Sequence, residues 1–453
     1  MQRRFDCAAM RVLGGVAIQA AALAIWNAPA HASNNLNVIG FGVQSIGMGG
    51  ADIPMSQSSE AVNINPAGLS QIGDRRFDYT LVPYYTGGGG HSDPLNGKSS
   101  PDNDFNPYYT GGGGHSDPLN GKSSPDNDFN ALFNVGYAHR LNPSLVLGAG
   151  LFVQGGSGYQ YKNLRTVFGT RDEYSAIFGV TKLALGAAYK VTDTFSVGAN
   201  LGIAYSQARQ KVFPDTSTAD FSGLRFDGGK GVSANGRIGL LWLPTPDLRI
   251  GASYMSPTTL KLDDATLTVN QEAQGLGRVR YRDAEIKGFH LAREAGVGIG
   301  WRFQPGWLLA VEFNWLDWSD AMKSATLRAR DPNKPGAPAS LAIVSPLNHR
   351  DQYVWSIGMA IDLGEKAQLL VGWNHTRNAI PSETLSPAFN LTTENEADLG
   401  LIYKISPKWE VGAVIQYQFD HDITYDNPDQ PFGAGAKEHY SLIGIDIGIT
   451  RRW

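Results

Sequence analysis

The last twelve residues of the chain, 442–453, alternate almost without a break between apolar side chains and small or polar ones. One set contains Ile443, Ile445, Ile447, Ile449 and Trp453, and the other contains Leu442, Gly444, Asp446, Gly448 and Thr450. Successive side chains of a β-strand point to opposite faces of the sheet. The pattern therefore predicts a strand that is apolar on one side only, and it limits the fold to sheets with two unlike faces.

Residues 1–32 have the features of an export leader. Arg3, Arg4 and Arg11 precede an apolar run at residues 12–26, and Ala30-His31-Ala32 supplies the small residues of a cleavage site. This is the pattern of a secretory signal peptide. The alternative, a membrane anchor, is disfavoured because a spanning helix needs roughly twenty apolar residues. We therefore expect export and cleavage near Ala32.

Composition excludes several kinds of chemistry. Cys7 is the single cysteine and lies in the predicted leader, so the remaining chain can form no disulfide, thiolate metal site or cysteine nucleophile. Removal of the leader takes three of 38 basic and one of 42 acidic residues, which leaves 35 against 41 and a formal charge of −6. We expect no nucleic-acid partner, and the sequence indicates no cofactor, metal site or catalytic residue.

Six short turns divide the chain into alternating stretches. They lie at residues 142–144, 192–194, 244–246, 304–306, 364–366 and 406–408. Each turn is expected to join a hairpin, which gives twelve strands. A first strand around Phe77, Tyr79 and Leu81 and the terminal strand bring the number to fourteen. An even number of half-apolar strands is typical of a membrane barrel, so we predict an all-β, 14-stranded antiparallel outer-membrane barrel over residues 76–453.

Aromatic residues give independent support for a membrane-spanning sheet. Trp409 and Phe419 end one apolar face ten residues apart, which spans about 24 Å at ~3.3 Å per residue and a tilt of ~40 to 45°. Tyr189, Phe195, Trp242, Phe303 and Trp307 lie beside other turns. A large soluble sandwich is the alternative. The long connections, residues 86–130, 156–177, 207–230, 262–292, 322–350, 377–394 and 421–437, are expected to be outer loops.

Residues 83–106 and 107–130 are the same 24-residue string. Identity over this length indicates a recent tandem duplication, because a solenoid would have diverged and needs about three copies. We place it in the first outer loop, where insertions cost little stability. We interpret it as a neutral expansion, and a lid that touches the ligand is the alternative.

Residues 33–75 precede the first strand and are expected to form a plug, here called the hatch, inside the barrel. A glycine-rich stretch from Gly40 to Gly50 leads to Asn65-Pro66-Ala67 just before the strand. This arrangement resembles the FadL/TodX family of outer-membrane transporters for hydrophobic compounds. The fourteen strands and the aromatic residue at the end of the last one extend the resemblance along the chain.

The resemblance implies passive uptake of long-chain fatty acids or related hydrocarbons. Family members capture the ligand near the outer loops and release it sideways, where the third strand kinks inward. Gly155 and Gly156 are the candidates for this kink, although they are also ordinary loop-opening glycines. An apolar path into the bilayer is physically favoured, since a buried methylene gains ~0.8 kcal/mol.

Candidate ligand-binding residues fall into two groups. The apolar group, expected in the third outer loop, contains Phe213, Phe221, Leu224 and Phe226. The second group contains inward-facing bases that would pair with a carboxylate: Lys182, Arg237, Arg249 and Arg302. Because Glu312, Asp398 and Glu410 also face inward, these bases have the alternative of forming salt bridges within the wall.

Two other functions remain open at this stage. A general diffusion porin would need an open lumen, which the predicted hatch disfavours. A lipase-type outer-membrane enzyme lacks support because the sequence contains neither Gly-x-Ser-x-Gly nor His-Glu-x-x-His. The expected partners are a hydrophobic small molecule, outer-membrane lipid and lipopolysaccharide, and the barrel assembly machinery. We expect a monomer.

Overall fold

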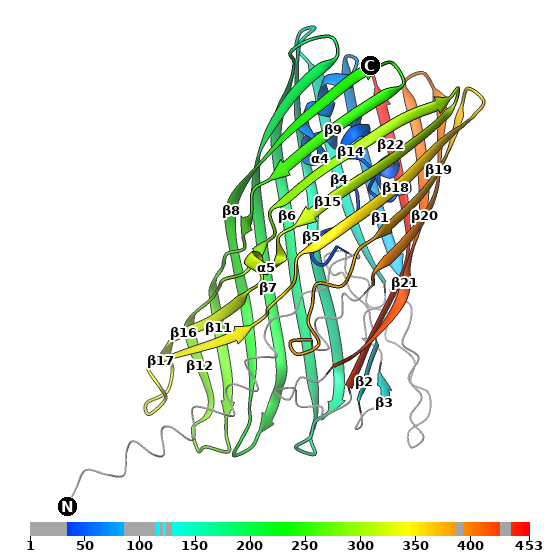
Figure 1. Cartoon of the computed structure of the whole chain (residues 1–453). Coiled ribbons are helices and arrows are strands. Elements are labelled where there is room, and N and C mark those ends of the chain that lie inside the picture. Colours follow the sequence, from blue (N-terminus) through cyan, green and yellow to red (C-terminus); the bar gives the residue numbers. More distant parts are fainter. Residues whose placement is uncertain (1–33, 86–113, 118–120, 124–128, 386–392, 426–435) are drawn as a thin grey trace, which may run out of the picture.

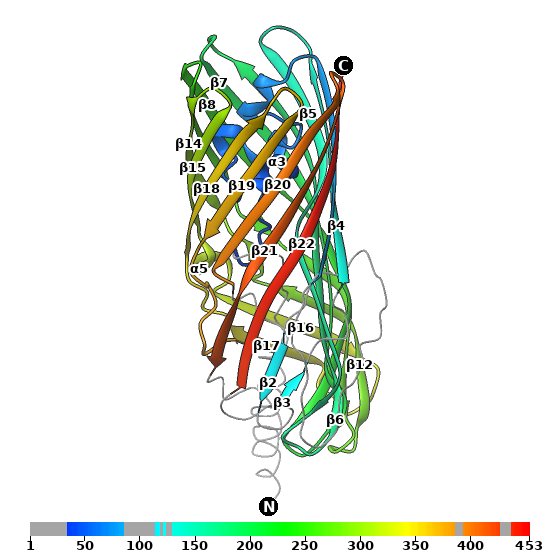
Figure 2. The same ribbon diagram turned by 90° about the vertical axis from the view of Figure 1, so that its right-hand side faces the viewer.

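The structure is a computed structural model, and it describes residues 34–85, 114–117, 121–123, 129–385, 393–425 and 436–453. Fourteen strands form a closed antiparallel barrel (Figures 1 and 2). In chain order they are β1 (Arg75–Tyr85), β4 (Phe129–Arg140), β5 (Leu145–Arg165), β6 (Arg171–Lys190), β7 (Phe195–Ser217), β8 (Ser222–Thr245), β9 (Leu248–Met255), β14 (Glu294–Gln304), β15 (Trp307–Leu316), β18 (Gln352–Leu363), β19 (Ala367–His375), β20 (Asn395–Ser406), β21 (Trp409–Tyr425) and β22 (Ala436–Arg452). The predicted all-β barrel with fourteen strands is confirmed.

The barrel closes where β22 pairs with β1, from Arg76↔Arg452 to Tyr85↔Ile443. All six predicted turns join neighbouring strands at one end, here called the short-turn end; the opposite end is called the outer end. On β22 the four isoleucines are between 37% and 52% exposed, whereas Asp446 is buried and Thr450 Oγ1 donates to Asp78 Oδ1 at 2.6 Å. The predicted apolar outward face of this strand is confirmed.

Four strands extend farther than the sequence pattern predicted. The segments 156–177 and 207–230, expected as loops, are mostly strand, because β5 pairs with β6 as far as Arg165↔Arg171 and β7 with β8 as far as Ser217↔Ser222. In the outer halves of β7 and β8 the alternation reverses. Val212, Leu224 and Phe226 are buried, while Arg225 on the opposite face is exposed. The pattern switches from apolar-out to apolar-in, with a bulge at the switch, and this break in the period explains why the prediction of loops here is wrong.

The predicted loops 262–292 and 322–350 also contain strands. β11 (Leu262–Gln271), β12 (Gly277–Lys287), β16 (Ser324–Pro332) and β17 (Ser340–Pro346) continue the sheet from the outer half of β8. β10 (Thr258–Thr259) pairs with β13 (His290–Leu291), and α5 (Trp318–Ala321) follows β15. β2 (Gly114–Asp117) pairs with β3 (Gly121–Ser123) and with β22. The tandem repeat lies largely outside the described residues.

The segment before β1 lies inside the barrel at the short-turn end, as the blue ribbons of Figure 1 show. It contains α3 (Val43–Gly47), η1 (Ile53–Met55), α4 (Ala61–Ile64) and η2 (Pro66–Gln71). These elements contact inward faces of strands around the barrel, including β6, β7, β8, β19 and β20. The described part of the chain contains no helix that is both long and apolar enough to cross a membrane.

Candidate ligand path and hatch

The outer end of the barrel encloses one large apolar cluster, here called the outer cluster. Phe213, Phe221, Leu224 and Phe226 all belong to it and are at most 2% exposed. The rings of Phe213 and Tyr174 lie 5.5 Å apart, and those of Phe168 and Phe221 lie 4.8 Å apart. The structure therefore brings the four predicted apolar residues together, with Phe213, Leu224 and Phe226 on strands and Phe221 in the short connection between β7 and β8.

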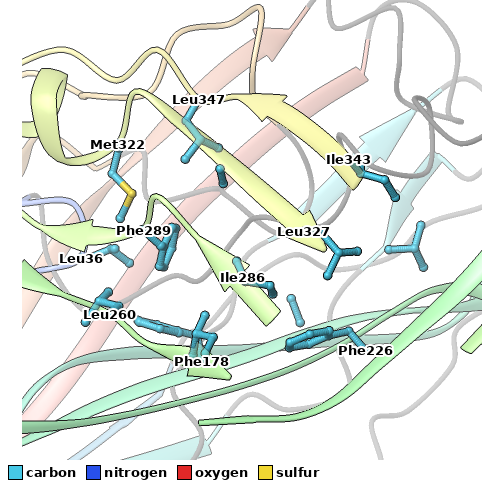
Figure 3. Packing of buried hydrophobic residues seen from close by; sticks show 14 of the residues in the cluster. Leu36, Phe178, Phe226, Leu260, Ile286, Phe289, Met322, Leu327, Ile343 and Leu347 are labelled. Atoms are coloured by element: carbon cyan, nitrogen blue, oxygen red, sulfur yellow. The ribbon is translucent and has the colours of Figure 1, made fainter. Parts of the chain in front are cut away.

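The outer cluster also contains residues that the sequence reasoning did not identify. Figure 3 shows Leu36 close to Phe178, Leu260 and Phe289. Leu36 comes from the segment just before the hatch helices, so the amino-terminal segment reaches from the short-turn end into the cluster. Asn35 Nδ2 and His349 Nδ1, which lie 2.9 Å apart, connect this segment to the loop before β18. No sequence period marks Leu36, because it lies in an irregular segment.

Lys182 lies on β6 below the outer cluster and is fully buried. Its Nζ has no hydrogen-bond partner among the described residues. Lys182 Cε and Asn235 Oδ1 occupy the space that a Cβ on Gly202 would fill. This Asn235 oxygen is also buried without a described partner. A buried amine without a partner is costly. Lys182 is therefore the predicted base best placed to meet a polar group of a bound ligand.

Arg237 is engaged with the hatch and the wall. Its Nη1 donates to Ile64 O at 2.7 Å and to Ser253 Oγ at 3.1 Å, and it forms a salt bridge with Glu294 Oε1 at 3.2 Å. Sequence reasoning did not identify Glu294, whose pairing depends on the register between β8, β9 and β14. These contacts give Arg237 a structural role beside the hatch.

Arg249 and Arg302 lie on the other side of the hatch. They line an open cavity of about 700 Å³ at the short-turn end, together with hatch residues such as Met55 and Glu60. This places the two arginines away from the outer cluster. Their assignment as ligand-binding residues stays a prediction, which this position does not favour.

The Asn65-Pro66-Ala67 motif anchors the hatch to the wall. Asn65 Nδ2 donates to Ile53 O at 2.9 Å and to Leu240 O at 3.0 Å, and Asn65 Oδ1 accepts from Ala67 N at 3.2 Å. Pro66 occupies the first turn of η2, where its missing N–H costs nothing. The motif thus fixes both the start of η2 and its contact with β8.

Carboxylates supply further anchors. Glu312 Oε2 on β15 accepts from Asp52 N at 2.9 Å and Ile53 N at 2.7 Å. Asp78 Oδ2 on β1 accepts from Ser59 N at 2.9 Å and Ser59 Oγ at 2.7 Å. Within the hatch, burial raises the pKa of Glu60 to about 8, and the nearby Asp78 carboxylate adds to the rise. Of the predicted inward acids, Glu312 serves the hatch, while Glu410 forms a salt bridge with Arg452.

The wall is interrupted between β4 and β5. Their ladder runs from Arg140↔Val146 to Asn134↔Phe152. Beyond it, β4 continues along β1 to Phe129, and β5 continues along β6 after a register shift between Val153 and Gly155. The two strands therefore separate beside Gly155 and Gly156, and we call this interruption the seam.

The outer half of β5 turns toward the hatch at the seam. Val38 N donates to Gln154 O at 3.5 Å. Val153 packs against an apolar group that contains Ile46, Val82 and Leu442. Val153, Ile46 and Val82 also line a cavity of about 20 Å³. The lining of the seam is thus mostly apolar, with Asn134, Glu396, Gln416 and Gln418 as its polar members.

The surface of the hatch that faces the barrel interior is polar by contrast. A cavity of about 60 Å³ between hatch and wall is lined by Asn37, Asn63, Gln154, Arg237 and Glu312, among others. Both side-chain polar atoms of Asn63 and the Nε2 of Gln154 are buried without a described partner. Within the described ranges, no cluster of three or more His, Cys, Asp or Glu side chains could hold a metal ion.

A closed fourteen-stranded barrel with an apolar outward face, an internal hatch and an apolar outer cluster defines a plugged outer-membrane channel. The chain belongs to the outer membrane protein transport protein family (OMPP1/FadL/TodX), whose profile matches residues 21–442. Its place is therefore the outer membrane and its general activity is the transport of hydrophobic compounds. The end with six short turns then faces the periplasm.

Solved structures show the same fold. The toluene transporter TodX of Pseudomonas putida superposes with a TM-score of 0.71 at 17% identity, over 92% of this chain and 99% of TodX. For the toluene transporter TbuX of Ralstonia pickettii the TM-score is 0.68 at 21% identity, over 92% and 99% of the two chains. A FadL homologue of Pseudomonas aeruginosa gives 0.67 at 15%, over 92% and 98%. No curated protein matches the sequence.

Proposed function

We propose that the protein carries hydrophobic small molecules, either long-chain fatty acids or aromatic and related hydrocarbons, passively across the outer membrane. The observation that supports this most is the buried outer cluster above a closed hatch, with an apolar seam in the wall between them. Proteins of similar structure include a toluene transporter and a monoaromatic hydrocarbon channel. We assign this protein no catalytic role.

Release of the ligand through the seam follows from the polarity of the path. A molecule that reaches the hatch from the outer cluster faces polar groups such as Asn63 and Arg237. Their desolvation without new hydrogen bonds is unfavourable. At the seam the lining is mostly apolar, with Val38, Val82 and Val153 beside polar residues such as Glu396. An apolar molecule therefore gains free energy by moving sideways into the bilayer, and Gly155 and Gly156 permit the bend that opens this route.

Uptake measurements test the proposed function. A strain that lacks this gene is compared with the same strain carrying it, and accumulation of radiolabelled oleate and toluene is followed. We expect the gene to restore uptake of at least one compound, and restoration of neither would contradict the proposal. In planar bilayers the intact protein is expected to give no large steady current, whereas such a current would favour a general diffusion porin.

Lys182 favours acids among the hydrophobic substrates. Its buried Nζ, which has no hydrogen-bond partner in the described part of the chain, lies below the outer cluster, where the carboxylate of an inserted fatty acid would pair with it. Replacement Lys182→Met removes the charge and keeps the aliphatic length. We expect oleate uptake to fall about tenfold while toluene uptake stays unchanged. Lys190→Met, at the periplasmic end of the same strand, is the matched control. An equal loss for both compounds would show a structural role only.

Maturation and assembly complete the proposal. The leader is cleaved near Ala32, which amino-terminal sequencing of the outer-membrane form would test. The chain is inserted by the barrel assembly machinery among outer-membrane lipid and lipopolysaccharide, and it functions as a monomer. Migration of the purified protein as a single barrel in native electrophoresis is the expected result, and a stable larger species would contradict it.

A further inference from the structure

A cluster of bases and aromatic rings lies on the lipid-facing side of the barrel at its periplasmic end, where β21, β22, β1 and β4 meet. Trp409 pairs with Arg451, and Phe77 pairs with both Arg451 and Tyr137. In the next row Arg75 pairs with His139, and Trp453 N donates to Arg75 O at 3.2 Å. Arg451 shares a strand face with the exposed Ile447 and Ile449, and Arg75 and Phe77 share one with the exposed Tyr79. Directly paired residues of neighbouring strands point to the same side of the sheet, so all these side chains point away from the lumen. We call this group the periplasmic basic patch.

The aromatic rings hold the bases in place. The Arg451 guanidinium carbon lies 5.1 Å from the centre of the Trp409 ring and 4.6 Å from that of Trp453. The Arg75 guanidinium lies 5.8 Å from the Trp453 ring, and Tyr137 meets that ring edge-on at 6.3 Å. Cation–π contacts fix the position of a guanidinium without neutralising its charge.

The patch holds more positive than negative charge. Arg451 forms no salt bridge with any described residue, and its Nε is buried without a described hydrogen-bond partner. Arg75 lies 3.5 Å from Asp74, but both side chains are about half exposed, 44% and 53%, so water screens this pair. The neighbouring Arg452 points into the lumen, where Glu410 neutralises it. Among the described ion pairs, Asp74 is thus the one acidic side chain that contacts the patch, and it contacts Arg75.

The position of the patch identifies the class of ligand. Tryptophan and tyrosine at this level mark the boundary between lipid tails and headgroups. Exposed apolar side chains continue from the patch toward the membrane centre, among them Ile449, Ile447 and Leu147. The two guanidiniums can bind phosphate oxygens. The apolar strip beside them can contact acyl chains. We propose that the patch binds the phosphate of an anionic phospholipid in the periplasmic leaflet.

Native mass spectrometry of the full-length mature protein in detergent tests this site. The probes are phosphatidylglycerol, phosphatidylethanolamine and inorganic phosphate. We expect at least fivefold more retained phosphatidylglycerol than phosphatidylethanolamine, because the ammonium group of the latter opposes the bases. Inorganic phosphate at equal concentration should not displace the lipid. Equal retention of the two lipids, or displacement by inorganic phosphate, would overturn the proposal.

Substitutions test whether the patch causes the preference for phosphatidylglycerol over phosphatidylethanolamine. The double variant Arg451→Gln with Arg75→Gln should retain the two lipids equally, and Lys190→Gln, which removes a periplasmic base outside the patch, should keep the preference. The variant Arg75→Gln with His139→Gln leaves the Arg451 stack intact and should lower the preference at least twofold, which covers the case in which the first variant fails to fold. A preference unchanged in this second variant would contradict the assignment.

Discussion

Glycine at two positions of the wall determines how closely the hatch approaches it. A Cβ on Gly239 would lie 1.9 Å from Asn65 Oδ1, and a Cβ on Gly198 would lie 2.3 Å from Ala67 N. Neither distance is possible for a real side chain, so the Asn-Pro-Ala motif contacts bare backbone. The sequence shows the motif and the glycines separately, but their contact depends on the barrel register.

Gly239→Ala should loosen the hatch. The added methyl forces Asn65 away from β8, which costs on the order of 1–3 kcal/mol and disturbs the hydrogen bond to Leu240 O. We expect more frequent current openings in planar bilayers. Gly236→Ala on the same strand is the control, because its Cβ would lie 3.5 Å from the nearest atom, Asn200 O, at ordinary contact distance. Equal behaviour of the two variants would argue against this anchor.

Glu60 should make hatch stability depend on pH. Burial raises its pKa in the folded protein to about 8, above the ordinary value of 4.5. The folded state therefore binds the proton more tightly than the unfolded state, and stability is lost as the pH rises between these values. We expect faster hydrogen exchange in residues 61–71 at pH 9 than at pH 6, after correction for the intrinsic rate. Glu60→Gln should flatten this dependence, and an undiminished dependence in that variant would assign it to another group.

At the level of elements, the outer half of β5 determines where the ladder between β4 and β5 ends. It leaves β4 after Phe152 and continues along β6, and Val153 packs against buried side chains such as Val82 and Leu442. The glycines at residues 155–156 indicated a weak point in this strand. The sequence could not show which neighbour β5 would leave, because that choice depends on pairing between distant segments.

Val153→Trp should obstruct the seam. The indole fills the space beside Val38 and Val82, which line the small cavity there. We expect uptake of the transported compound to fall about tenfold. Leu151→Trp is the matched control on the same strand, because Leu151 still pairs with Val135 below the seam. The comparison requires that both variants show the heat-dependent electrophoretic shift of a folded barrel, and equal uptake by the two would contradict a route through the seam.

At the level of the whole molecule, the sequence predicted the part of the fold that lies in lipid. There, strand period, turn residues and aromatic ends are local signals, so the six turns and the closure of β22 on β1 could be predicted. At the outer end the alternation is reversed, because the outward face meets water and the inward side chains form the outer cluster. For the same reason Phe213 and Phe226 were identified as apolar candidates, whereas the strands that carry them were mistaken for loops.

The site was predictable only in part. The alternation along β6 places Lys182 on an inward face. That its Nζ has no hydrogen-bond partner among the described residues depends on the packing of the whole barrel. Arg237 was grouped with that lysine, and the structure instead engages it with Ile64, Ser253 and Glu294. Leu36 gave no signal because irregular segments have no period.

In the proposed transport route the ligand leaves through the wall and not past the hatch. A disulfide between Val62→Cys in the hatch and Gly148→Cys on β5 would lock the hatch, since the Cβ of residue 148 would lie 3.3 Å from Val62 Cβ, near the usual ~3.5–4.5 Å. Cys7, the only natural cysteine, lies in the predicted leader. Uptake of the transported compound is measured in cells before and after reduction of this disulfide. We expect locked and reduced proteins to transport within about twofold of each other. Loss of uptake in the locked protein, with recovery on reduction, would contradict this route.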